Sequence, residues 1–281
     1  MKNQQKLGFI GVGNMGGALV RGVASAGAGT FTAADIVVTD TREAVLTEIV
    51  EACGVRAVAD AAQLVAASEV VVLAVKPQVM LAVLAPLRDR FDPNVHTVVS
   101  VAAGLTLAQL EAALPAGTPV VRVMPNTPAH VGLGASAYAL GTHADKRHGA
   151  IAEAIFGAVG IVQEVTEDEI HAVIAVSGSG PAYFFHMIEA LVDGGVAAGL
   201  TPEVSRALAL QTALGAATLA ARSEKPPGLL RQNVMSPGGT TEAAIRSLDK
   251  DGFQDVVKRC MAAAHARSVE MGADEPSEPT A

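Results

Sequence analysis

The chain has 281 residues, half of them apolar, which is enough for two domains with a substantial buried core. Its 28 acidic residues outnumber the 20 basic ones, the net charge is -8, and no basic cluster could neutralise a phosphate backbone, so we expect no nucleic-acid partner. The longest apolar runs fall far short of the ~20 residues that cross a bilayer, and the polar start lacks a signal-peptide pattern, so we expect a cytoplasmic protein without a membrane span.

Short apolar runs alternate with Ala-rich amphipathic stretches over residues 1–165, which is the pattern of β-α-β units around a parallel sheet. The run Val70 to Val75 has no polar alternation, so both of its faces must be covered, and we place it at the centre of the sheet. The sequence therefore predicts an α/β fold that begins with a doubly wound, Rossmann-type domain over residues 1–165. The predicted strands are Leu7 to Ile10, Ile36 to Thr39, Val70 to Val75, Thr97 to Val101 and Val120 to Met124.

The first predicted strand runs into Gly11-Val12-Gly13-Asn14-Met15-Gly16, which opens a helix. In this setting Gly11 permits a tight turn, Gly13 lets the backbone touch a pyrophosphate, and Gly16 lets the helix pack on the strand. Glycine-rich turns also connect strands to helices without any ligand. The strand, the helix and the N-terminal position together favour dinucleotide binding.

The second predicted strand ends at Thr39-Asp40-Thr41-Arg42, where a residue should meet the adenosine ribose. The Asp40 carboxylate could accept hydrogen bonds from a free ribose hydroxyl and repel a 2'-phosphate, whereas Arg42 and Thr41 could hold that phosphate. The alternative is an ordinary helix start with a charge in its first turn. These residues leave the choice between NADH and NADPH open.

Three further segments follow predicted strands, at the edge where ligands of doubly wound sheets bind. They are Lys76-Pro77-Gln78, Ala102-Ala103-Gly104 and Pro125-Asn126-Thr127-Pro128. Each is also a good turn without a ligand. Their shared position favours a cofactor groove.

After Val165 the strand pattern ends, and residues 166–272 are predicted to form an all-helical substrate-binding and dimerisation domain, followed by a loose acidic tail over residues 273–281. Helices are expected over Ala182 to Ala198 and Glu203 to Ala221, with a break at Ser177 to Pro181. Their Ala and Gly residues allow the close helix packing of an interlocked dimer, although a monomeric bundle is the simpler alternative. The two cysteines lack paired spacing and suit a reducing compartment.

The segment Ser236-Pro237-Gly238-Gly239-Thr240-Thr241 leads into a predicted helix, so its last N–H groups and hydroxyls are unsatisfied donors at a positive dipole end. Such a loop can bind a small carboxylate without Arg or Lys, although a well-capped helix start would also explain it. We find no metal-ligand spacing, nucleophile triad or carboxylate pair. We therefore expect no metal, and the chemistry must rely on a cofactor.

Along almost its whole length the chain resembles pyrroline-5-carboxylate reductases. The resemblance rests on six motifs in order: Phe9-Ile10-Gly11-Val12-Gly13-Asn14-Met15-Gly16, Ala74-Val75-Lys76-Pro77, Ala102-Ala103-Gly104, Met124-Pro125-Asn126-Thr127-Pro128, Ser177-Gly178-Ser179-Gly180-Pro181-Ala182-Tyr183 and Ser236-Pro237-Gly238-Gly239-Thr240-Thr241.

The resemblance, together with the ribose-end residues above, implies a set of cofactor contacts, with Val101 to Ala103 and Asn126 near the nicotinamide and Asn233 reaching the cofactor from the helical domain. The substrate carboxylate would be held by Ser236, Gly239, Thr240 and Thr241, with the Thr241 hydroxyl as the catalytic group at the ring nitrogen. The full cofactor set is Ile10, Gly11, Val12, Gly13, Asn14, Met15, Gly16, Asp40, Thr41, Arg42, Ala74, Val75, Lys76, Pro77, Val101, Ala102, Ala103, Asn126 and Asn233.

The activity that the resemblance implies is hydride transfer from NADPH or NADH to the imine of 1-pyrroline-5-carboxylate, which gives proline. A protonated imine is already electrophilic, so positioning beside the nicotinamide is the main requirement. The resemblance also implies a homodimer, with larger rings such as a decamer, and an active site built from two subunits. Asp40 departs from the Ser, Thr or Asn that NADPH-preferring members often carry.

Two other functions compete with this interpretation. A hydroxyacid dehydrogenase of the 6-phosphogluconate dehydrogenase type would need a lysine on the helix that links the domains, and no Lys or Arg occurs from Ile170 through Pro202. A non-catalytic nucleotide sensor could keep the glycines of the first domain, but it would have no use for the Ser236 to Thr241 segment.

Overall fold

The computed structural model describes residues 5–26 and 31–273. They form two compact units: one contains the described residues up to Ser179 and again from Ala264, and the other runs from Gly180 to Ala263. Residues 166–179 belong to the first unit because Ile170 is fully buried against its sheet. The domain limits at 165/166 and 272 stay a prediction. The expected tail falls outside the described residues from residue 274 onward.

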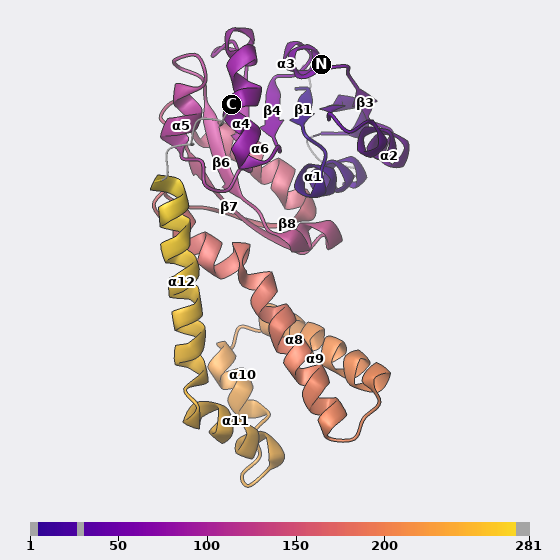
Figure 1. Cartoon of the computed structure of the whole chain (residues 1–281), viewed down its shortest axis with the longest axis vertical. Helices are drawn as coiled ribbons and strands as arrows, with labels where there is room; N and C mark the ends of the chain where they lie inside the picture. The colour runs from indigo at the N-terminus through magenta and orange to yellow at the C-terminus, as the bar shows by residue number, and fades with distance from the viewer. Residues whose placement is uncertain (1–4, 27–30, 274–281) are drawn as a thin grey trace, which may run out of the picture. The chain divides into compact units, whose positions relative to one another are not determined.

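The first unit is built on one eight-stranded sheet with the order β3-β2-β1-β4-β5-β6-β7-β8 (Figure 1). The strands β3, β2, β1, β4, β5 and β6 all run parallel, which confirms the predicted doubly wound fold. β4 lies between β1 and β5, as expected for a central strand. The strands are β1 (Leu7–Ile10), β2 (Ile36–Thr39), β3 (Arg56–Ala57), β4 (Val70–Leu73), β5 (Thr97–Ser100), β6 (Val120–Met124), β7 (Gly134–Leu140) and β8 (Gly160–Glu164).

Three of these strands were not predicted from the sequence. β3 has two residues, which is too short to show a periodicity. β7 runs antiparallel to β6, and β8 is parallel to β7, so the sheet is not parallel throughout. Because β7 returns antiparallel to β6, the start of β7 lies beside the loop that follows β6.

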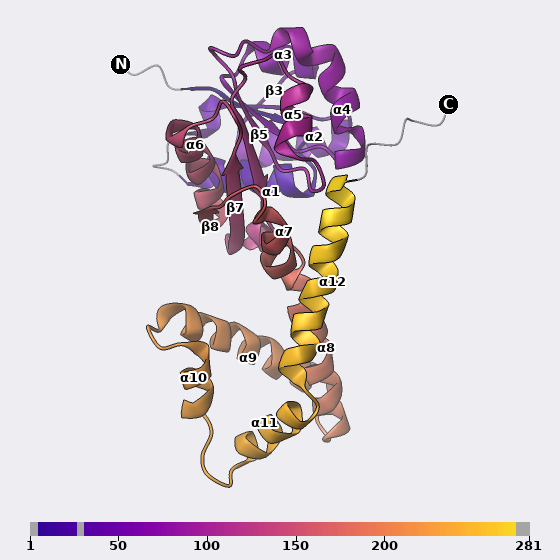
Figure 2. The ribbon, with the colours of Figure 1, turned by 90° about the vertical axis from the view of Figure 1, so that its left-hand side faces the viewer.

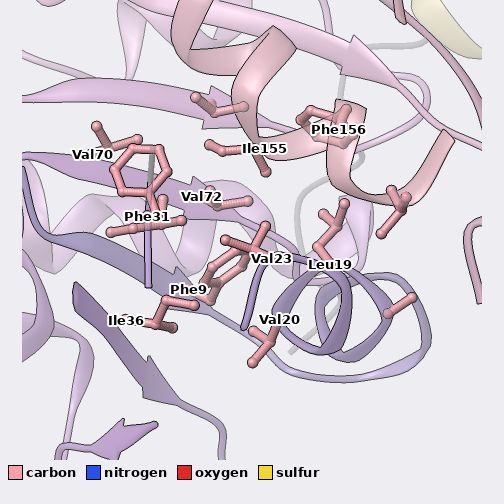
Figure 3. Packing of buried hydrophobic residues seen from close by; sticks show 14 of the residues in the cluster. Phe9, Leu19, Val20, Val23, Phe31, Ile36, Val70, Val72, Ile155 and Phe156 are labelled. Atoms are coloured by element: carbon pink, nitrogen blue, oxygen red, sulfur yellow. The ribbon is translucent and has the colours of Figure 1, made fainter. Parts of the chain in front are cut away.

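Apolar side chains cover both faces of the sheet. Val70 and Val72 join one cluster, while Val71 and Leu73 join the other, so alternate residues of β4 face opposite helical layers. Figure 3 shows the first cluster, where Phe9 and Val72 of the sheet lie against Leu19 and other residues of the helices. This two-sided burial explains why the strands read as continuous apolar runs.

Helices on the two faces complete the first unit. Those that contribute to the first cluster are α1 (Asn14–Ser25), α2 (Glu43–Cys53) and α6 (Lys146–Phe156); those that contribute to the second are α3 (Ala61–Ala66), α4 (Pro77–Leu84), α5 (Leu107–Ala112) and α7 (Ile170–Val173). Short turns of 3-10 helix are η1 (Ala33–Asp35), η2 (Ala85–Arg90), η3 (Thr127–Val131) and η4 (Gly157–Val159).

The predicted break at Ser177 to Pro181 is a change of helix type. After α7 the chain forms a π-helical turn, η5 (Ile174–Gly178), and continues almost at once into α8 (Gly180–Ala197). The N–H of Ser179 donates to the carbonyl of Ile174, five residues back, at 2.8 Å. Glycine and proline in this segment therefore widen the helix by one residue without ending it.

The second unit is made of helices (Figure 2), and few of its residues are buried. α8 and α9 (Pro202–Arg222) pack against each other, and a Cβ on Gly195 would lie 2.1 Å from the Ser205 hydroxyl, so a glycine is required there. α10 (Pro227–Asn233) and α11 (Thr240–Lys250) have no buried residue, and α12 (Phe253–Ala273) starts in this unit and ends in the first. Cys260 on α12 is exposed, while Cys53 is half-buried.

Candidate functional site

The loop after β1 has the geometry that the glycine pattern predicts. Gly11 has φ +93°, and its N–H donates to the carbonyl of Thr39 on β2 at 2.9 Å. A Cβ on Gly16 would lie 2.1 Å from the Gly11 carbonyl oxygen, so a side chain there would push α1 off the turn. Gly11 permits the turn, and Gly16 lets the helix start directly on it.

The N-terminus of α1 fits a pyrophosphate. Gly13 is the N-cap, and no side chain caps the helix. Within the described residues, the N–H groups of Asn14, Met15 and Gly16 have no acceptor, because the first helical bond is that of Gly17 to Gly13 at 2.7 Å. Three free donors at a helix N-terminus beside a residue without a side chain suit a bound anion. The described residues therefore fit a dinucleotide.

Asp40, at the end of β2, is bonded inside the protein. One carboxylate oxygen accepts the N–H of Val12 at 2.9 Å and Nη2 of Arg42 at 3.0 Å, and the other accepts the N–H and Nε of Arg42 at 2.9 and 3.0 Å. The Asp40 side chain is 6% exposed and the Arg42 side chain 58%. Burial raises the pKa of Asp40, but these hydrogen bonds outweigh it and leave the pKa below its ordinary value.

This arrangement gives the two ribose-end candidates different roles. Asp40 joins the glycine loop to Arg42, and its acceptor positions are occupied. Arg42 presents an exposed guanidinium beside Gly13, since a Cβ on Gly13 would lie 3.0 Å from its Nη2. Thr41 is exposed at the same place. The group available to a ligand at the end of β2 is therefore a cation.

The other strand-end residues of the first unit gather at the same edge, because the carboxyl ends of parallel strands point the same way. Ala74 follows β4, and its N–H donates to the carbonyl of Ile10 at 2.9 Å. A Cβ on Gly11 would lie 2.9 Å from the carbonyl oxygen of Ala74. Lys76 caps α4, with Pro77 at the first helical position. Ala102 is buried after β5, between half-buried Val101 and Ala103, and Val75 is half-buried.

Asn126 also lies at this edge, in the loop after β6, but its amide is engaged with the protein. Nδ2 donates to the carbonyl of Ser177 at 3.0 Å, and Oδ1 accepts the N–H of Ala135 at 2.9 Å. The residue is 8% exposed. It ties the loop after β6 to the π turn and to the start of β7.

The remaining predicted site residues belong to the second unit. Asn233 is exposed at the end of α10. In the segment Ser236 to Thr241, Gly238 has φ +72° and its N–H donates to Oε2 of Glu242 at 2.6 Å, while the N–H of Gly239 donates to the Ser236 carbonyl at 2.9 Å. The N–H of Gly239, predicted to bind substrate, is therefore already bonded within the loop.

Unpartnered donors remain at the start of α11. Gly239 is its N-cap without a side-chain hydrogen bond, and the N–H groups of Thr240 and Thr241 have no acceptor within the described residues. The hydroxyls of both threonines are also without a partner there, and Thr241 is half-buried. Adjacent N–H donors and a hydroxyl can bind a carboxylate and one further polar atom.

One residue and one contact were missed from the sequence. Glu242, three residues after the N-cap, has the spacing of a capping-box glutamate and occupies one loop N–H, so this signal was available. The Asn126 to Ser177 contact spans 51 residues and left no local signal. Among the described residues, no group of His, Cys, Asp and Glu could hold a metal ion, and no helix is long and apolar enough to cross a membrane.

Comparisons with protein families cover both parts of the chain. The model described as pyrroline-5-carboxylate reductase dimerisation matches residues 167–271. A second model, described as NADP oxidoreductase coenzyme F420-dependent, matches residues 6–104.

Individual relatives match over nearly the whole chain. A pyrroline-5-carboxylate reductase of Arabidopsis thaliana is 42% identical over 266 residues, which cover 95% of each chain. A solved pyrroline-5-carboxylate reductase from Coxiella burnetii has TM-score 0.90 and 38% identity and covers 96% of this chain and 99% of its own. A Plasmodium falciparum pyrroline carboxylate reductase, solved with NADP bound, has TM-score 0.82 and 31% identity, with 97% and 99% covered.

Proposed function

Because the chain belongs to the pyrroline-5-carboxylate reductase family, we propose that its strand-end loops hold the nicotinamide cofactor and that the Ser236 to Thr241 loop holds the substrate. The chain is an NAD(P)H-dependent oxidoreductase that reduces the C=N bond of 1-pyrroline-5-carboxylate to proline, the last step of proline biosynthesis. The hydroxyacid dehydrogenase and nucleotide-sensor alternatives are not favoured.

In this proposal the pyrophosphate is bound by Gly11 to Gly16, at the free N–H groups of α1. Arg42 and Thr41 face the ribose end, with Asp40 holding Arg42 in place. The loops at 74–77 and 101–103 line the path toward the nicotinamide, to which Asn233 adds a contact from the helical unit. When bound, the cofactor supplies the hydride.

The free donors at the start of α11 are the observation that carries the substrate assignment. The N–H groups of Thr240 and Thr241 would bind the carboxylate, with Ser236 and Gly239 shaping the loop around it. The Thr241 hydroxyl would accept a hydrogen bond from the ring N–H and orient the C=N bond, and water could supply the exchangeable proton. No strong base is needed, because the protonated imine is already electrophilic.

We further propose a homodimer in which the helical units interlock, with larger rings such as a decamer built from these dimers. The dimerisation model covers α8 to α11 and most of α12. Large apolar side chains on α8 and α9 are exposed in the single chain, among them Phe184, Phe185 and Leu214. Reduced nicotinamide and free cysteines suit the cytoplasm as the compartment.

The test is an absorbance assay of reduced-nicotinamide oxidation with 1-pyrroline-5-carboxylate and NADPH or NADH. We expect substrate-dependent oxidation and the appearance of proline by mass spectrometry. Parallel reactions without substrate, and with a 2-hydroxy acid and oxidised cofactor, serve as controls. Oxidation of neither cofactor would contradict the proposal, and turnover of the hydroxy acid would favour the dehydrogenase alternative.

A further inference from the structure

The chain leaves the first unit through the π turn at Ile174–Gly178, because the division between the units falls after Ser179. This turn packs closely on the end of β6: a Cβ on Gly178 would lie 2.8 Å from Cε of Met124. The Ser177 hydroxyl donates to the Val173 carbonyl at 3.1 Å, so the turn also has a local bond. Asn126 is a further anchor of the turn.

The Ser177 carbonyl needs a donor from outside its own helix. In a regular α-helix it would accept the N–H of the residue four positions later. That residue is Pro181, which has no N–H. Nδ2 of Asn126 donates to this carbonyl at 3.0 Å and replaces the missing backbone donor.

The other end of the same amide fixes its orientation. Oδ1 of Asn126 accepts the N–H of Ala135 at the start of β7, at 2.9 Å. Because one partner is a donor and the other an acceptor, the Asn126 amide satisfies both, whereas a carboxylate would face the Ser177 carbonyl with a second acceptor. Asn126 is buried and bonded at both ends.

We propose that Asn126 is a positioning residue for the reduction, acting through the π turn at the point where the chain enters α8. It joins that turn to the loop after β6 at the ligand edge and to the start of β7, and so holds this edge of the cofactor site in place. The inference rests on the proposed function and deepens it, because Asn126 then acts without direct contact with the cofactor. Small errors in placing hydride donor and acceptor are costly in rate, so a loose turn lowers turnover.

A double-mutant cycle with Pro181 tests the proposal. Asn126→Asp keeps an acceptor for Ala135 but removes the donor to Ser177, and Pro181→Ala returns a backbone N–H four residues after Ser177. We expect N126D to lower kcat about tenfold in the wild-type background and less than about threefold in the P181A background. The dissociation constant of NADPH alone, measured by nicotinamide fluorescence, should change less than about twofold.

Hydrogen exchange supplies a readout that does not depend on turnover. The N–H of Ser179, which closes the π turn on Ile174, should lose protection in N126D and regain it in N126D/P181A. Equal kcat losses in both backgrounds, or an unchanged exchange rate at Ser179, would overturn the proposal. A large change in NADPH affinity without rescue by P181A would instead assign Asn126 a direct contact with the cofactor.

Asn126→Ser repeats the cycle if N126D does not fold, since its shorter side chain reaches neither partner. The wild-type assay separates the two claims. Without wild-type reduction of 1-pyrroline-5-carboxylate the proposed function fails, whereas the exchange measurements still decide whether Asn126 holds the turn.

Discussion

Arg42 presents its guanidinium from the end of β2, while Asp40 beneath it is almost fully buried. Because all the acceptor positions of Asp40 that the structure shows are bonded to Arg42 and Val12, the exposed group is a cation fixed by a carboxylate. A fixed guanidinium is better prepared for a phosphate than a freely moving one, since less conformational entropy is lost on binding. This geometry favours the 2'-phosphate of NADPH at a place where the sequence alone left two cofactors open.

Arg42→Ala should therefore lower kcat/KM with NADPH more than with NADH. A hydrogen bond between charged groups is worth about 1.5 to 3 kcal/mol, so we expect a loss of roughly ten- to a hundredfold with NADPH. With NADH the loss should stay below about threefold. Asp40→Asn is the matched control, since it keeps the shape but removes the charge and should give a smaller effect. Equal losses with both cofactors would show that Arg42 does not contact the 2'-phosphate.

Thr241→Ala tests the hydroxyl assigned to the substrate ring nitrogen. Because this hydroxyl has no partner within the described residues, its removal should leave folding nearly unchanged. We expect kcat to fall by roughly ten- to a hundredfold, the value of one hydrogen bond to a charged group. Thr241→Ser keeps the hydroxyl and should retain most of the activity. If T241A has wild-type kcat and KM, Thr241 plays no part in the reaction.

Single residues with a local signal could be placed from the sequence, and those with distant partners could not. Gly11 and Gly16 were interpretable because the turn and the helix start lie within six residues of each other. The partner of Asp40 on the glycine loop is 28 residues away, and the sequence suggested a ribose contact instead. Asn126 was expected near the nicotinamide, which stays a prediction, and its bonds to Ala135 and Ser177 had no local signal because they depend on the paths of β7 and η5.

Among the elements, the C-terminal part of α12 docks on α7 through His171. Nδ1 of His171 lies 2.8 Å from the Ser268 hydroxyl, and the His265 ring packs edge-on at 6.0 Å between centroids. Desolvation by burial lowers the pKa of His171, with further lowering by Arg122 and His265, while Asp168 and Glu167 oppose it. The docked helix therefore favours a neutral His171.

This shift gives the docking a direction of pH dependence. Since the pKa of His171 is lower in the folded chain than its ordinary 6.5, the unfolded state binds the proton first on acidification. The free energy of unfolding is therefore unaffected by His171 above pH 6.5, and it should decrease as the pH falls from there toward the pKa of His171 in the folded chain. We expect denaturant unfolding to show this decrease, and His171→Gln to reduce its slope. His143→Gln, at an exposed histidine of the first unit, is the control, and an equal slope in wild type and H171Q would contradict the assignment.

The elements that the sequence predicted well are those with burial on both faces. β1, β2 and β6 have the predicted bounds, whereas β4 and β5 end one or two residues early, because Ala74 and Val101 turn into the ligand edge. β7 and β8 were missed, since Gly134 and Ser136 interrupt the small apolar residues of β7, and half-exposed β8 does not produce a continuous apolar run. The π turn could not be told from a break, because Gly and Pro signal both.

At the scale of the whole molecule, the second unit does not bury its own apolar surface. Leu208, Leu214 and Leu219 on α9 are each more than half exposed, as are Phe184 and Phe185 on α8. Exposed apolar side chains in this density mark a surface that another chain covers. The sequence pointed the same way through its small residues, but it could not separate close packing inside one chain, as between Gly195 and Ser205, from packing between two.

Leu214→Glu should therefore weaken the dimer. Burying a leucine contributes about 1.5 to 3 kcal/mol, and in a symmetric dimer the same residue counts twice, so the dissociation constant should rise at least about a hundredfold. The buried charge adds to this loss.

Gln63→Glu, on α3 of the first unit, introduces the same charge at an exposed position and should leave the dimer intact. Sedimentation velocity over a range of concentrations measures both, and activity should fall with the dimer fraction, because the proposed site takes residues from two subunits. A wild-type monomer, or a Leu214→Glu dimer as tight as the wild type, would restore the simpler alternative of a monomeric helical bundle.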